Sequence, residues 1–236
     1  MKRALDAGAS LRAARVPPTP QAMDDAVEFA SLIGSRLCHD LLSPVGSFGN
    51  GLELLADEQD PTMRARFVEL LDSSARAAIG RLKFSRLAYG SSSGYGEGIA
   101  REDLTDALRG LVAEGRDVTL RWVGDATSVP KPAARVLLLL GQVVVESLIR
   151  GGSVDLAAEP HGQGWELAVR GTGERVVIDP TLIAALEAET APTPKTVGVA
   201  LARRIAAACD GTMMVARPEG GELLVGASLA RVAAAP

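Results

Sequence analysis

The sequence predicts an α+β protein in which an N-terminal antiparallel helical hairpin precedes a C-terminal α/β sandwich. Apolar residues recur at helical spacing over two long stretches, 24–57 and 61–89, which the short break DEQDP separates. After the polar segment GSSSGYGEG the pattern changes to short helices interleaved with strands of alternating hydrophobicity. That second pattern is typical of a mixed sheet packed under helices.

The chain of 236 residues is expected to divide into four segments. We predict a flexible Ala/Pro-rich tail at 1–22, the helical hairpin at 23–90, a linker at 91–98 and the α/β domain at 99–236. The tail lacks the apolar region of a secretory signal, and the longest apolar runs are too short to cross a bilayer. We therefore expect no membrane association.

The composition excludes several classes of function. A net charge of -4 argues against a nucleic-acid binder, because such proteins carry a basic footprint. The two cysteines are far apart in sequence, which disfavours a disulfide framework and fits a reducing cytoplasm. With only two histidines as well, there is no zinc-type ligand spacing, and we expect no metal site.

Each long helix carries an apolar stripe that we expect to be buried. The stripe of the first comprises Phe29, Ile33, Leu37, Leu41, Val45, Phe48, Leu52 and Leu55. The second helix is predicted to begin at Pro61, which suits the first helical position. A lone hairpin would leave much of these stripes in water, so pairing into a homodimeric four-helix bundle is the simplest expectation. Docking of the α/β domain onto the hairpin is the alternative.

The α/β domain is expected to contain four helices, one single strand and two β-hairpins. The helices are predicted at 101–115, 130–152, 179–189 and 195–211, the strand at 117–124, and the hairpins at 153–171 and 212–229. The helix at 130–152 is the most apolar of the four and is predicted to be buried.

The first helix contains His39 within the stretch SRLCHDLLSPVGSFGNGLELL. On a helical wheel, the small or polar residues that share its face are Ser35, Arg36, Ser43, Gly46 and Asn50. We therefore expect His39 to be exposed and reachable by another protein. A neutral imidazole, with an ordinary pKa of about 6.5, is a nucleophile near neutral pH. The adjacent Asp40 can hold its tautomer or accept its proton, and Pro44 is expected to kink the helix.

Further residues are candidates for contact with a phosphoryl group or with a docking protein: Arg36, Ser43, Pro44, Gly46, Asn50, Lys83 and Arg86. The cations could neutralise a transferring phosphoryl group or steer an acidic partner, or they could simply solvate a helix face. Gly46 could equally serve close helix packing. Cys38, beside His39, is expected to be a buried thiol.

The motif HDLLSP, inside a long helix that a second helix and an α/β domain follow, resembles the H-box of sensor histidine kinases, H-[DE]-x-[KR]-T-P. The resemblance covers residues 24–230 and implies a dimerisation and phosphoacceptor hairpin followed by a kinase-type ATP-binding (Bergerat) domain. It implies that His39 is the phosphoacceptor, that Asp40 is the assisting acid and that Pro44 bends the helix.

The sequence departs from the kinases in the ATP-binding domain. Gln142 and Glu146 in GQVVVESLI stand where kinases have two asparagines that coordinate magnesium and phosphates. Arg170 in RGTGER replaces the adenine-binding aspartate, and Gly198 is the one clear glycine left in the phosphate loop. A phosphate cradle needs successive unobstructed backbone N–H groups. We therefore expect neither ATP binding nor a bound cofactor.

A phosphoacceptor hairpin with a degenerate ATP-binding domain is similar to the ChpT-type histidine phosphotransferases, whose signature the stretch around His39 closely resembles. The resemblance implies that His39 shuttles a phosphoryl group between receiver-domain aspartates, with Mg²⁺ supplied by the receiver. It implies a CckA-like hybrid kinase as donor and CtrA-like and CpdR-like response regulators as acceptors in a cell-cycle relay. The alternatives are an active sensor-type kinase with a divergent ATP site and a non-catalytic receiver-binding scaffold.

Overall fold

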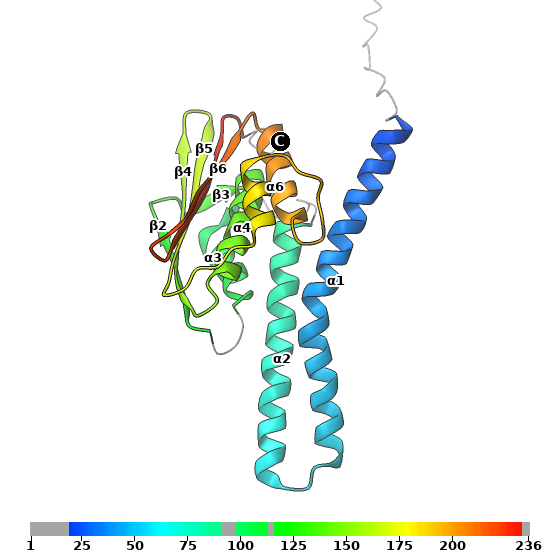
Figure 1. Cartoon of the computed structure of the whole chain (residues 1–236). Coiled ribbons are helices and arrows are strands. Elements are labelled where there is room, and N and C mark those ends of the chain that lie inside the picture. Colours follow the sequence, from blue (N-terminus) through cyan, green and yellow to red (C-terminus); the bar gives the residue numbers. More distant parts are fainter. Residues whose placement is uncertain (1–18, 91–97, 113–115, 233–236) are drawn as a thin grey trace, which may run out of the picture.

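The structure, a computed structural model, describes residues 19–90, 98–112 and 116–232. Figure 1 shows a long two-helix hairpin beside a more compact part built from a sheet and shorter helices. The predicted α+β class is confirmed. Most of the predicted tail and linker, residues 1–18 and 91–97, lie outside the described residues.

The hairpin consists of α1 (Pro20–Asp57) and α2 (Pro61–Ala88), as the apolar periodicity predicts. The carboxylate of Asp60 accepts a hydrogen bond from the backbone N–H of Thr62 at 2.8 Å and so caps α2, with Pro61 in the first turn. Helix α1 begins at Pro20, inside the stretch predicted as tail. That boundary was wrong because proline, which suggested a tail, is well tolerated in a helix's first turn.

The packing of α1 against α2 differs from the predicted stripe in its second half. Val45 and Leu52 are 56% and 49% exposed in the single chain, whereas Pro44 and Gly51 are buried. A Cβ on Gly51 would lie 2.9 Å from Cδ2 of Leu71, so the helices approach closely at a residue without a side chain. Periodicity marks apolar residues and therefore missed this small-residue contact. Helix α1 continues through Pro44 and changes direction along its length, its N-terminal half leaning away from α2 (Figure 1).

The remaining strands form two sheets. Their bounds are β1 Gly98–Ala100, β2 Val118–Val123, β3 Ser128–Pro130, β4 Gly152–His161, β5 Gly164–Thr172, β6 Thr212–Glu219 and β7 Glu222–Leu229. The main sheet has the order β2-β4-β5-β7-β6, with β2 parallel to β4 and the other pairs antiparallel. Strands β1 and β3 pair separately and were missed, because three residues are too few to display a period.

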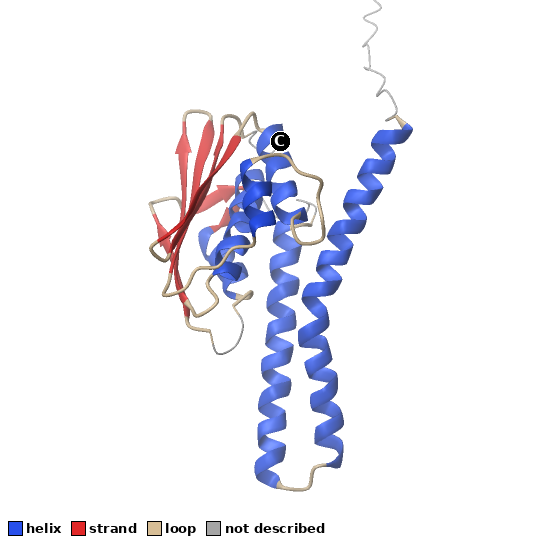
Figure 2. Ribbon diagram, in the orientation of Figure 1, coloured by secondary structure: helices blue, strands red, loops and turns tan. Residues whose placement is uncertain are grey.

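Helices cover one face of the main sheet, on the side toward the hairpin (Figure 2). They are α3 Arg101–Arg109, α4 Lys131–Ser147, α5 Pro180–Glu187 and α6 Val197–Ala208. The most apolar of them, α4, is almost entirely buried, as predicted. In the part of the chain that the structure describes, none of the helices is both long and apolar enough to cross a membrane.

The hairpin and the sheet share one hydrophobic core. Phe84, Leu87 and Ala88 at the end of α2 are buried in the same cluster as the helices and strands of the C-terminal part. Arg135 Nε also donates to the backbone oxygen of Ala88 at 3.1 Å, which ties α4 to the end of α2. The C-terminal part is therefore held in a defined position beside the hairpin, next to the segment that carries His39.

Candidate functional site

The face of α1 around His39 is open, as the helical wheel predicts. The side chain of His39 is 83% exposed. Ser43, Gly46 and Asn50, which follow it on α1, are exposed as well. A Cβ on Gly46 would meet no atom within 4 Å, so this glycine does not serve packing within the chain. An approaching protein therefore reaches the imidazole over small side chains.

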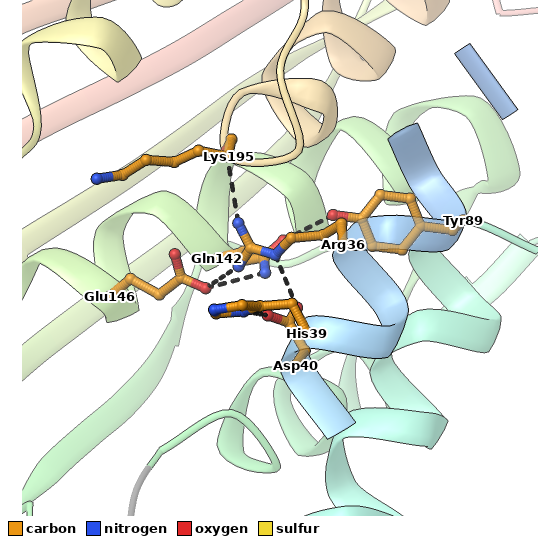
Figure 3. A network of polar contacts seen from close by, with 7 residues as sticks. All are labelled: Arg36, His39, Asp40, Tyr89, Gln142, Glu146 and Lys195. Atoms are coloured by element: carbon orange, nitrogen blue, oxygen red, sulfur yellow. Dashed lines mark hydrogen bonds and ion pairs between the residues drawn. The ribbon is translucent and has the colours of Figure 1, made fainter. Parts of the chain in front are cut away.

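Asp40 has one carboxylate oxygen near His39 and the other on Arg36 (Figure 3). Oδ1 of Asp40 lies 3.4 Å from Nδ1 of His39, a long contact of the kind that tightens when a site is engaged. Oδ2 accepts a hydrogen bond from Nε of Arg36, one helical turn earlier, at 2.8 Å. Arg36 therefore limits the rotation of the carboxylate that faces the imidazole.

Arg36 joins α1 to the C-terminal part of the chain. Its Nη2 donates to Oε1 of Glu146 on α4 at 2.5 Å, and its Nη1 donates to the backbone oxygen of Lys195 at 3.4 Å. The Arg36 side chain is only 12% exposed. Burial lowers the pKa of this guanidinium, but Glu146 and then Asp40 raise it by more, so the group stays cationic.

Glu146 is in turn held by a hydrogen-bond chain that starts at the end of α2. Tyr89 Oη donates to Oε1 of Gln142 at 3.1 Å, and Nε2 of Gln142 donates to Oε1 of Glu146 at 2.9 Å (Figure 3). Burial raises the pKa of Tyr89, and Asp40 and Glu146 raise it further while Arg36 lowers it, so the hydroxyl remains a neutral donor. A Cβ on Gly198 would lie 2.9 Å from this hydroxyl, which explains the need for glycine there.

Three of the predicted contact residues are not part of the open face around His39. Lys83 and Arg86 line a hollow between α2 and α3, whose walls come from those helices and the turn after α3. Pro44 is buried in the single chain, so the prediction that it contacts a partner was wrong. The prediction that Cys38 is buried was also wrong, because this thiol is exposed. Both errors follow from the phase of α1, whose inward face passes through Asp40, Pro44 and Gly51.

Sequence reasoning missed the roles of Tyr89, Gln142, Glu146 and Lys195 in this network. Gln142 and Glu146 were noticed as departures from the kinase pattern, but nothing local to them indicated a partner. Arg36 and Glu146 are 110 positions apart. A carboxylate at a position expected to hold an amide was the one available signal, because a half-buried charge needs a counter-charge.

The arrangement consists of an exposed imidazole, a carboxylate at its Nδ1 and a cation behind that carboxylate. Such a set can support nucleophilic attack by Nε2 while the carboxylate stabilises or accepts the proton on Nδ1. Among the described residues no three His, Cys, Asp or Glu side chains gather closely enough to hold a metal ion.

Comparisons with known proteins find several chains that this one resembles. The family model described as "Histidine phosphotransferase C-terminal domain" matches residues 101–228. Protein phosphotransferase ChpT of Brucella abortus (strain 2308) is 31% identical over 166 residues, which are 67% of this chain and 74% of that protein. A solved structure of a bacterial phosphotransferase, 23% identical, superposes with a TM-score of 0.73 over 86% of this chain and 96% of that one. The histidine kinase AdeS of Acinetobacter baumannii, 14% identical, gives a TM-score of 0.43 over 81% and 96% of the two chains.

Proposed function

Because this chain belongs to the family of ChpT-type histidine phosphotransferases, we propose that His39 carries a phosphoryl group between the receiver-domain aspartates of a phosphorelay. The observation that carries this assignment is the exposed imidazole of His39 with Asp40 at its Nδ1. Phosphotransfer agrees with the name of the Brucella relative, protein phosphotransferase ChpT. The choice of His39 rests on the motif HDLLSP and on this geometry.

The transfer follows from which imidazole nitrogen is open. Asp40 faces Nδ1, so Nε2 of His39 attacks the phosphorus of an aspartyl phosphate. A P–N bond forms, the P–O bond breaks, and the aspartate leaves as a carboxylate with the bonding electron pair. The imidazole becomes an N-phosphorylated imidazolium whose Nδ1 proton faces Asp40, which stabilises the positive charge or takes the proton. Transfer to a second receiver reverses these steps.

We propose that the chain does not bind ATP and does not phosphorylate itself. In support, the helix that coordinates magnesium and phosphates in kinases here uses Gln142 and Glu146 in hydrogen bonds within the protein. The space that Gly198 leaves is next to the hydroxyl of Tyr89. Arg170, where an adenine-binding aspartate was expected, donates to Asp155 at 2.7 Å. Residues that depart from the kinase pattern are therefore engaged in hydrogen bonds within this chain, which supports the proposal.

The partners that we propose are receiver domains, which approach as acidic surfaces and bring Mg²⁺ with them. The donor is the receiver of a CckA-like hybrid kinase, and the acceptors are CtrA-like and CpdR-like response regulators of a cell-cycle relay in the cytoplasm. Arg36 is mostly buried, so the small exposed residues Ser43, Gly46 and Asn50 are the better candidates for direct contact.

We also propose that the protein is a homodimer. Each helix of the hairpin exposes an apolar stripe: Val45, Phe48 and Leu52 on α1, and Val68, Ile79 and Leu82 on α2. Residues at this spacing occupy one side of a helix. Pairing two hairpins into a four-helix bundle would remove both stripes from water without covering the face of His39.

The function is tested with a receiver domain that carries a radiolabelled aspartyl phosphate. We expect label to move to the wild-type protein and to the His161→Ala control, but not to His39→Ala, and a second receiver should then remove it. Label on His39 after incubation with ATP alone would support an autokinase instead. Receiver binding without any transfer of label would support a scaffold.

A further inference from the structure

Helix α4, which matches the helix that contacts the phosphates of ATP in kinases, forms an ion pair with the helix that carries His39. Glu146 is 41% exposed at its side chain, yet its Oε1 accepts from both Arg36 and Gln142, at 2.5 and 2.9 Å. The acceptor comes from α4 and one donor from α1, so this oxygen is a junction between the two parts of the chain.

Building on the phosphotransfer function proposed above, we propose that Glu146 is a positioning residue through which the C-terminal part orients Asp40 beside His39. The hydrogen bonds of Glu146 go to Arg36 and Gln142, and none joins it to the imidazole or to Asp40. It acts on Asp40 through Arg36, whose Nη2 it holds while Nε of the same guanidinium holds Oδ2 of Asp40.

The planar guanidinium makes this coupling directional. Nε and Nη2 lie on one rigid fork, so a carboxylate fixed at one of them sets the plane that the other presents. The backbone oxygen of Lys195 accepts from Nη1 and limits rotation on a third side. With Arg36 held in this way, one oxygen of Asp40 is occupied and the other is left facing Nδ1 of His39.

Electrostatics also supports the proposal that Glu146 acts on Asp40 through Arg36. Asp40 and Glu146 are both carboxylates, and a cation between them is what allows them to share the site. Replacing Glu146 by glutamine removes the charge with little change in shape. Arg36 would then lose one of its two carboxylate partners, and Oδ1 of Asp40 would no longer be directed at His39 by a guanidinium in a fixed plane.

The test is a double-mutant cycle on the full chain, with Glu146→Gln, Arg36→Gln and the double variant, scored by the rate of label transfer from a phosphorylated receiver. We expect Glu146→Gln to slow transfer on the order of tenfold and Arg36→Gln by at least as much. Because Glu146 acts through Arg36, the double variant should be no slower than Arg36→Gln alone. The matched control is Glu174→Gln, which removes an exposed ion pair to Arg150 in the same part of the chain.

A second readout follows the imidazole itself, because the chain has only two histidines. Long-range ¹H–¹⁵N spectra recorded about two pH units above the ordinary imidazole pKa of ~6.5 report which nitrogen carries the proton. We expect His39 in the wild type to favour the Nδ1–H tautomer, and Glu146→Gln to shift it toward Nε2–H. His161 is the internal reference and should not change.

Several outcomes would overturn the proposal. They are a Glu146→Gln rate equal to the wild-type rate, effects of the two single variants that multiply in the double variant, or an unchanged tautomer of His39. A wild-type protein that accepts no label would refute the proposed function instead. In that case the tautomer measurement would still report whether Glu146 orients Asp40.

Discussion

Arg36 and Glu146 meet across the boundary between the hairpin and the C-terminal part, with Nη2 of Arg36 2.5 Å from Oε1 of Glu146. Glu146 lies on α4, the helix whose sequence resembles the nucleotide-binding helix of kinases but lacks its two asparagines. In the structure, the substituted residues of that helix form ordered bonds toward the helix that carries His39. The residues that depart from the kinase pattern on this helix therefore belong to a network inside the protein.

Replacing Asp40 by asparagine should slow phosphotransfer while leaving the fold intact. The amide can no longer accept the Nδ1 proton of His39 or stabilise its positive charge, which is worth about 10²-fold or more in other acid–base sites. The rate of label transfer measures the effect. Asp72→Asn is the matched control, because Asp72 accepts from Arg76 Nε at 2.7 Å in a similar one-turn pair on α2. Rates within twofold of each other would contradict a role for Asp40.

A larger side chain at Gly46 should block a partner and not the fold. A Cβ at Gly46 or at Gly34 meets no atom within 4 Å, so Gly46→Gln and Gly34→Gln should each stabilise α1 by up to about 1 kcal/mol. Gly46 shares the face of His39, whereas Gly34 lies well round the helix from it. Only Gly46→Gln should therefore slow transfer, which receiver-binding and transfer assays would measure. Equal effects of the two variants would refute docking over this face.

Placing a charge in the apolar stripe of α1 should produce a monomer. Val45→Glu would bury a carboxylate at the interface of the proposed four-helix bundle, and sedimentation velocity should report the mass of one chain. Val123→Glu is the control, because Val123 on β2 is 50% exposed and lies outside the hairpin. A wild-type protein that already sediments as a monomer would contradict the dimer.

Adding a methyl group at Gly198 should disturb the hydroxyl of Tyr89. The new Cβ would lie 2.9 Å from Tyr89 Oη, so Gly198→Ala should cost about 1 kcal/mol in the free energy of unfolding. In a Tyr89→Phe background the clash is absent, and the same substitution should stabilise α6 by up to about 1 kcal/mol. Chemical denaturation of the four proteins measures this difference. The same sign in both backgrounds would show that the hydroxyl is not the cause.

The cap of α5 should make stability depend on acid pH. Asp179 accepts from the backbone N–H of Thr181, and Lys195 first and Thr181 second lower the pKa of Asp179 well below its ordinary value. A depressed carboxyl pKa contributes stability above the unfolded-state pKa of about 3.9, and that contribution is lost as the pH falls toward the folded-state value. Asn keeps the cap without the charge. The difference in melting temperature between the wild type and Asp179→Asn should thus be present at neutral pH and shrink below about pH 4.

Much of the architecture could be predicted because its signals are local. Capping and proline placement at Asp60–Pro61 mark the start of α2, and the long apolar run of α4 indicates a buried helix. The errors arise where a signal was too short or ambiguous. Strands β1 and β3 have three residues each, and within the single chain α1 packs against α2 through Pro44 and Gly51, which an apolar pattern does not mark.

Sequence alone was enough to predict that His39 is followed by a carboxylate and lies on a helix face of small residues. Both properties depend on neighbours within two helical turns, for which helical geometry alone settles the outcome. Arg36, one helical turn before Asp40, holds that carboxylate, and what holds Arg36 is visible only in the folded chain. The bond from Arg36 to Glu146 joins residues 110 positions apart, and it exists because the packing of α2 and α4 into one core places Glu146 beside α1. Neither the apolar periodicity nor any motif near Arg36 or Glu146 indicates that these two residues meet.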